Sequence, residues 1–158
     1  LYYRAGQSVI VPKGNPRGIA GPDDLCGLFS IACSGCAAEV QTHALSEQCV
    51  ANGNSPIDFQ PSADQESAAR QLENGRTDFF LDGTGSAVER VRARDGMEIA
   101  FNVDTGLVAG FAVAEGNEEM LQIVFEGLQQ LEESGRLDEL IAQYGFSEEV
   151  RVPVEMRR

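Results

Sequence analysis

The residues of this sequence best able to do chemistry by type and spacing are its four cysteines, Cys26, Cys33, Cys36 and Cys49. A CxxC pair such as Cys33 and Cys36 can form a redox couple or half of a zinc site. Redox CxxC motifs normally open a helix after a strand in a thioredoxin-like unit, and zinc needs a second pair of ligands. The sequence therefore leaves the state of this pair open.

The only histidine is His43. A Cys3His zinc site built from Cys33, Cys36, His43 and Cys49 is one alternative, but the last two would lie along a helix rather than in a compact knuckle. His43 also lacks a serine, cysteine or carboxylate partner at motif spacing, so we expect a surface residue of an amphipathic helix. The sequence predicts no metal, no cofactor and no catalytic residue.

The outer cysteines bracket one predicted strand-helix unit. Cys26 precedes the strand, and Cys49 lies near the end of the helix that follows it. Because such a unit folds back so that its two ends approach each other, we predict a Cys26 to Cys49 disulfide. A disulfide implies an oxidising compartment.

Short β-rich runs alternate with helical patterns, which predicts an α/β fold with a mainly parallel sheet flanked by helices. The predicted strands are rich in Val, Ile, Phe or Leu and are bounded by Gly, Pro, Asn or Asp. They cover residues 8–11, 29–33, 57–60, 78–81, 98–102 and 107–113.

Helix signals fall between and after these runs. Capping-box patterns at Ser62 and Ser86 predict helices that begin near residues 63 and 87. From Asn117 the apolar residues recur with helical period, which predicts a carboxy-terminal helical hairpin that turns near residues 134–135.

Two features at predicted strand ends could bind a ligand. Gly35 and Cys36 join a strand to a helix, where backbone N–H groups and the positive helix end can hold an anion. Asp82 ends another strand at its carboxyl edge, where open α/β sheets bind ligands. A site for an anion that faces a carboxylate would suit a zwitterion, which carries one negative and one positive group.

Composition narrows the classes of partner. With 158 residues, 42% of them hydrophobic, the chain can form one packed core. Its net charge of −13 would repel nucleic acid and anionic lipid surfaces. No run approaches the roughly 18 to 20 apolar residues that a membrane span needs.

Several motifs, taken in order, resemble the family 3 extracellular solute-binding proteins of ABC importers. They include Ser-Val-Ile-Val-Pro-Lys-Gly-Asn-Pro (8–16), Pro-Asp-Asp-Leu-Cys-Gly (22–27), Ser-Gly-Cys (34–36), Gly-Arg-Thr-Asp (75–78) and Gly-Phe-Ala-Val-Ala-Glu-Gly-Asn (110–117). The resemblance covers almost the whole chain and implies a periplasmic-binding-protein-like fold. Such proteins have two α/β lobes joined by a hinge, and they close on a polar amino acid or similar small polar solute.

The resemblance also implies a division of the chain. Residues 1–12 would form a hinge-crossing strand, and residues 13–105 the inserted ligand-binding lobe. Residues 106–146 would form the return crossing and the terminal helices, and residues 147–158 an irregular tail. The amino-terminal lobe is absent from this sequence, so we expect self-association through the exposed terminal helices.

The family's ligand loop falls on Gly35 and Cys36, with Ala37 next, and its ammonium-binding aspartate falls on Asp82. Cys36 and Ala37 replace residues whose hydroxyls commonly contact the ligand, so backbone N–H groups would bind there. The resemblance further implies an ABC transporter permease as partner, no enzymatic activity, and an extracellular or periplasmic location, with or without a lipid anchor.

Two alternatives share this fold. One is the extracellular sensor domain of a receptor kinase, which a transmembrane helix and kinase domain in the parent gene would reveal. The other is a periplasmic dehydratase, which needs a general acid facing its substrate, and His43 gives little support for one.

Overall fold

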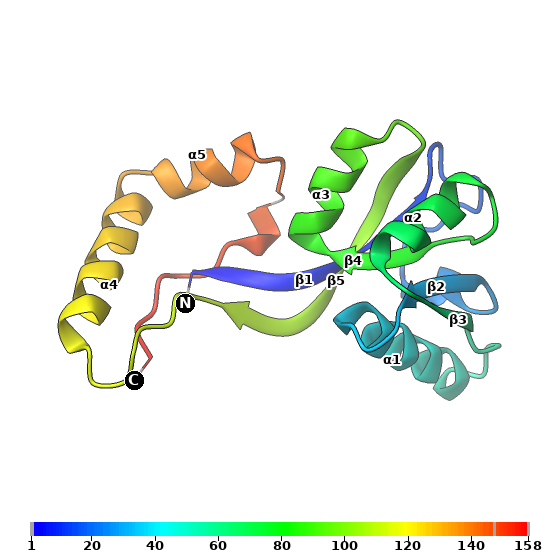
Figure 1. Cartoon of the computed structure of the whole chain (residues 1–158), viewed down its shortest axis with the longest axis horizontal. Helices are drawn as coiled ribbons and strands as arrows, with labels where there is room; N and C mark the ends of the chain where they lie inside the picture. Colours follow the sequence, from blue (N-terminus) through cyan, green and yellow to red (C-terminus); the bar gives the residue numbers. More distant parts are fainter. Residues whose placement is uncertain (1, 147, 158) are drawn as a thin grey trace. The chain divides into compact units, whose positions relative to one another are not determined.

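The computed structural model describes residues 2–146 and 148–157, which form a mixed α/β structure (Figure 1). Two short 3-10 turns, Pro22–Leu25 and Glu148–Val150, accompany the main elements. The strands are β1 (Tyr3–Pro12), β2 (Phe29–Cys33), β3 (Asp58–Ser62), β4 (Phe80–Gly83) and β5 (Met97–Ala109). The helices are α1 (Ala37–Ala51), α2 (Gln65–Glu73), α3 (Thr84–Ala93), α4 (Glu118–Glu133) and α5 (Arg136–Gln143).

The chain divides into two compact units. The central unit is Gln7–Val103, and the terminal unit combines Leu1–Gly6 with Asp104–Arg158. These boundaries lie within β1 and β5, close to the ends of the predicted lobe of residues 13–105. The predicted hinge role of these two strands stays a prediction.

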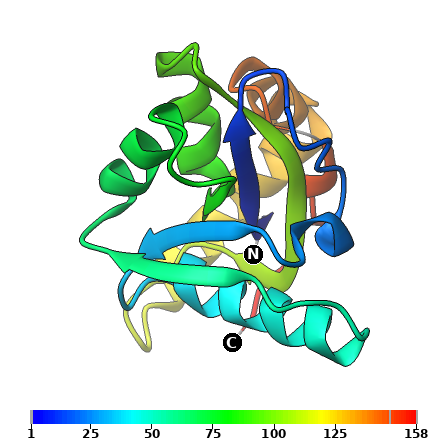
Figure 2. The same cartoon turned by 90° about the vertical axis from the view of Figure 1, so that its right-hand side faces the viewer.

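Strands β1 to β5 form two sheets, one of β4, β1 and β5 and one of β2 and β3. Strands β2 and β3 are parallel, with Phe29 opposite Asp58, and Figure 2 shows them side by side with α1 along one face. Strand β1 lies between β4 and β5 and pairs antiparallel with β4. An isolated parallel bridge between Ser30 and Phe79 connects β2 to the start of β4.

The predicted α/β class is therefore confirmed, but the expectation of a mainly parallel sheet is wrong for β1. Strand β1 pairs antiparallel with β4, with Ser8 opposite Asp82. The bridge between Ser30 and Phe79 is parallel, so the chain reverses direction between β1 and β2, over residues 13–28.

The core lies on both faces of β1. Val9 and Val11 belong to one buried cluster, whereas Ile10 belongs to a second cluster with Phe80. Successive side chains of a strand point to opposite faces, and all three β1 side chains are 0% exposed. Strand β1 is thus covered on both sides within the central unit.

Several predicted boundaries differ from the structure. Residues 98–102 and 107–113 were expected as two strands, but β5 runs unbroken from Met97 to Ala109 and no strand covers residues 110–113. Helix α2 is capped by the Asp64 carboxylate, which accepts the Ser67 N–H at 2.7 Å, rather than by Ser62. Helix α3 begins at Thr84, before Ser86.

The terminal unit contains the predicted helical hairpin. The Asn117 side chain accepts the Met120 N–H at 3.1 Å at the start of α4, as its sequence position indicates. Gly135 joins α4 to α5 with φ of 73°, a left-handed conformation that glycine adopts without strain. No residue of α4 is buried, and Leu137 is the buried residue of α5. Within the described residues, no helix is long and apolar enough to cross a membrane.

Candidate functional site

Asp82 is the predicted ammonium anchor, and the structure places it in β4, two residues before α3 begins. It is the third residue of β4, opposite Ser8 of β1, and it is 5% exposed. Its Oδ1 accepts the Gly83 N–H at 2.8 Å, and its Oδ2 accepts from Nε of Arg90 at 2.9 Å. An ionised carboxylate offers about four acceptor sites. These two hydrogen bonds use two of those acceptor sites.

The predicted anion seat lies where β2 passes into α1. Cys33 ends β2, Gly35 turns the chain with φ of 75°, and Cys36 is the N-cap of α1. No side chain caps the helix at Cys36. The Gly35 N–H, however, is donated to the carboxylate of Glu39, which lies in the first turn of the same helix. The Cys36 N–H is also donated, to the Cys33 carbonyl oxygen at 3.4 Å. A ligand anion at Gly35 or Cys36 would therefore have to replace these acceptors, whereas at Ala37 it would meet the next backbone N–H of the helix start.

Strand register relates the two predicted site segments. The parallel bridge sets Ser30 opposite Phe79, and three residues further along each strand come Cys33 and Asp82. The carboxyl ends of β2 and β4 therefore lie at one edge of the same structure. This edge of the central unit carries both the start of α1 and the Asp82 carboxylate.

A network of charged side chains supports Asp82, and the sequence analysis missed it. Arg90 of α3 donates to Asp82 and also to Glu66 of α2, the latter at 3.0 Å. Arg94 contacts Glu66 as well and reaches Glu73 at 2.6 Å. Only 16% of the Arg90 side chain and 8% of the Asp82 side chain are exposed. Arg90 thus fixes the Asp82 carboxylate from the helix that follows it.

A sequence signal could have revealed one contact near the site, the hydrogen bond from the Gly35 N–H to Glu39. Glu39 is three residues after Cys36, which is the spacing of a capping-box acceptor at a helix start. Arg90 carries no comparable local signal, because its contact with Asp82 depends on how α3 is rotated against β4.

The cysteines form two pairs in the structure. The Cys26 and Cys49 sulfur atoms are 2.06 Å apart, and the Cys33 and Cys36 sulfur atoms are 2.00 Å apart, both at disulfide distance. The ring of His43 packs edge-on against Phe59 with centroids 4.9 Å apart. The structure therefore does not assemble the Cys3His set considered as a zinc site.

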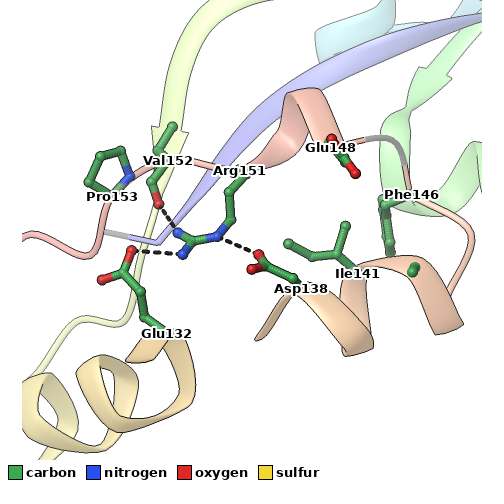
Figure 3. Close-up of a pocket in the computed structure, with 9 residues that line it drawn as sticks. Glu132, Asp138, Ile141, Phe146, Glu148, Arg151, Val152 and Pro153 are labelled. Carbon is green, nitrogen blue, oxygen red and sulfur yellow. Dashed lines mark hydrogen bonds and ion pairs between the residues drawn. The ribbon is translucent and has the colours of Figure 1, made fainter. Parts of the chain in front are cut away.

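A pocket of about 590 Å³ lies in the terminal unit, and none of the predicted site residues is among those that line it (Figure 3). Arg151 donates to Asp138 at 2.8 Å and to Glu132 at 2.7 Å, and it also donates to the Val152 carbonyl at 2.6 Å. The hydrogen bond to Glu132, followed by the one to Asp138, raises the pKa of Arg151. Arg151 thus connects the segment after α5 to α4 and α5, and its charge is paired with carboxylates of the terminal unit. The pocket lining comprises Glu132, Asp138, Ile141, Ala142, Phe146, Glu148, Arg151, Val152 and Pro153.

No protein-family model matches the sequence, and no curated protein sequence matches it. Solved structures do match. The second substrate-binding domain of GlnP from Lactococcus lactis, in an open conformation, matches 90% of this chain at 20% identity, with a TM-score of 0.74. The unliganded L-cystine solute receptor of Neisseria gonorrhoeae matches 96% at 17% identity, with a TM-score of 0.70. An ancestral arginine-binding protein bound to arginine matches 90% at 23% identity, with a TM-score of 0.60.

The chain has the periplasmic-binding-protein-like fold. It spans 61%, 59% and 60% of the ancestral protein, the GlnP domain and the cystine receptor, respectively, so it corresponds to part of each. Within this periplasmic-binding-protein-like chain, the edge that carries Cys36, Ala37 and Asp82 belongs entirely to the central unit.

Proposed function

We propose that this chain is the ligand-binding lobe, with the terminal helices, of the solute-binding component of an ABC importer. Its ligand would be an amino acid or a similar small polar solute, bound without chemical conversion. The proposal is supported by the fold shared with amino-acid-binding receptors and by the two charged features at one edge of the central unit.

The observation that carries the proposal is that the start of α1 and Asp82 lie at the same edge of the central unit. A ligand carboxylate would accept backbone N–H groups near Cys36 and Ala37, favoured by the positive end of a 15-residue helix. The ligand ammonium would donate to the carboxylate of Asp82, whose negative charge is oriented by Arg90. Binding at Gly35 itself would require the Glu39 carboxylate to leave the Gly35 N–H.

The cellular setting is part of the same proposal. Two cysteine pairs at disulfide distance suit an oxidising compartment, which supports an extracellular or periplasmic location. The partner would be the importer's permease, approached by the closed, ligand-bound form.

A panel titration tests this function. The whole gene product that contains this chain is titrated calorimetrically with the common amino acids, and its melting temperature is followed with each of them. We expect at least one to bind with a raised melting temperature, because a ligand of the folded state stabilises it. A well-folded product that binds none of them contradicts the proposal.

A further inference from the structure

We propose that the Cys33–Cys36 pair is a redox-active disulfide whose substrate is a thiol. The inference does not depend on the proposed amino-acid binding, because it concerns the sulfur atoms rather than the backbone N–H groups of the same turn.

The structure places this pair at the junction of a strand and a helix. Strands β2 and β3 are parallel and are joined through α1, so they form a βαβ unit. Cys33 is the last residue of β2 and Cys36 is the N-cap of α1. The CxxC motif therefore joins a strand to a helix start, which is the position of redox-active CxxC motifs.

The helix start favours one sulfur as the leaving group. Cys36 lies at the positive end of α1, where helix dipoles stabilise a thiolate. Two nearby groups act against this effect: the Glu39 carboxylate, held on the Gly35 N–H, and the Cys33 carbonyl oxygen, 2.8 Å from the Cys36 sulfur. Cys36 is the N-cap residue and Cys33 lies three residues before it, so we infer that the dipole stabilises the Cys36 thiolate more and that exchange releases it.

Exposure separates this pair from the other one. Cys49 is 2% exposed and belongs to the buried core, whereas Cys26 and Cys36 are half-buried and both pack against that core. Cys33 and Cys36 are both half-buried, and the two residues between them, Ser34 and Gly35, are exposed. Neither Cys33 nor Cys36 is as deeply buried as Cys49, so we infer that a thiol in solution reaches the Cys33–Cys36 bond more readily than the Cys26–Cys49 bond.

The exchange is balanced in two steps. A substrate thiolate attacks Cys33 Sγ, the Cys33–Cys36 bond breaks, and its electron pair leaves on Cys36 Sγ. A second substrate thiolate then attacks the substrate sulfur of this mixed disulfide, which releases the oxidised substrate disulfide and the Cys33 thiolate. Two thiols are oxidised, the protein disulfide is reduced to a dithiol, and the thiolates take protons according to the pH.

Timed alkylation of the whole gene product tests the proposal. Native protein is incubated with reduced glutathione or, in a second arm, with a reduced protein dithiol of the thioredoxin type, then quenched with an alkylating reagent and mapped by mass spectrometry. We expect Cys33 and Cys36 to be labelled at least 100-fold faster than Cys26 and Cys49. Reaction with glutathione identifies a small thiol as sufficient, whereas reaction with the protein dithiol alone identifies a protein thiol as the substrate.

Variants locate the attacked sulfur. In Cys36→Ser, the remaining Cys33 thiol should form a stable mixed disulfide with oxidised glutathione, because no second thiol can resolve it. In wild type, the trapped glutathione adduct should map to Cys33. An adduct that maps to Cys36, or Cys33 and Cys36 that are labelled only together with Cys26 and Cys49 in denaturant, overturns the proposal.

Discussion

The two units of the chain differ in how they bury apolar residues. The central unit has two buried clusters, and side chains such as Phe80 and Ile10 are fully covered. In the terminal unit α4 has no buried residue, and Phe111 and Ile123 are 61% and 57% exposed. The central unit therefore contains its own core, whereas the terminal helices present apolar surface typical of a segment that packs on a partner.

The largest expected effect comes from a test of this contrast with one substitution in each unit. Phe80→Ala removes a fully buried ring and should lower the free energy of unfolding by about 3 to 5 kcal/mol. Phe125→Ala, at a half-buried residue of α4, should lower it by about 1 kcal/mol or less. Urea unfolding followed by circular dichroism measures both, and similar losses at the two sites would contradict the contrast.

The two cysteine pairs of the central unit should differ in how much they stabilise it. Removal of the Cys26–Cys49 crosslink, with a sequence separation of 23, should cost about 3 kcal/mol in the chain-entropy model. Removal of the Cys33–Cys36 crosslink, with a separation of 3, should cost about 2 kcal/mol. Double Cys→Ser variants compared by thermal unfolding test the order, and the account fails if the second pair proves the more stabilising.

Self-association should arise from the terminal unit. We expect light scattering on this 158-residue chain to show dimers or larger species, and Ile123→Lys to reduce them, because it places a charge on the exposed apolar face of α4. Val40→Lys is the matched control, since Val40 is 69% exposed on α1 in the central unit. A monomer at high concentration, or an equal response to both variants, would count against this expectation.

The smallest expected effects concern one aspartate in each unit. The Ser67 backbone N–H lowers the pKa of Asp64 below its ordinary 3.8, and the Gly106 N–H does the same for Asp104. A carboxyl group with a lowered pKa in the folded state stabilises the protein above its unfolded pKa, and this contribution is lost as the pH falls through the folded pKa. Carboxyl titration by NMR should give both midpoints below 3.8. The Asp64→Asn and Asp104→Asn variants each lose one carboxyl signal and so assign the two signals to their residues. A midpoint at or above that value refutes the corresponding hydrogen bond.

Local patterns in the sequence predicted some elements closely. The run of Phe29 to Cys33 predicted β2 to the residue, and Asn117 predicted the start of α4. Long-range contacts decided the rest. Residues 103–106 lay between two predicted strands, yet the Arg4 side chain pairs with Asp104 at 3.0 Å and β5 continues through this segment.

The candidate site was only partly predictable for the same reason. The ends of β2 and β4 follow from strand and turn signals near Gly35 and Asp82. The Arg90 contact with Asp82 joins residues on two elements, and its geometry depends on the packing of α3. Sequence patterns describe each element and not that packing.

The central claim is that Asp82 anchors the ammonium group of an amino-acid ligand, and a pair of variants tests it directly. Asp82→Asn and Asp78→Asn each remove a charge paired with an arginine in the central unit, Arg90 and Arg17 respectively. Asp78 precedes β4, at the end opposite to the proposed site, so it is the matched control. Calorimetric titration of the whole gene product with its cognate amino acid should show Asp82→Asn binding about 30-fold more weakly or worse, roughly 2 kcal/mol or more. Asp78→Asn should bind as wild type does, and an unchanged dissociation constant in folded Asp82→Asn would contradict the account.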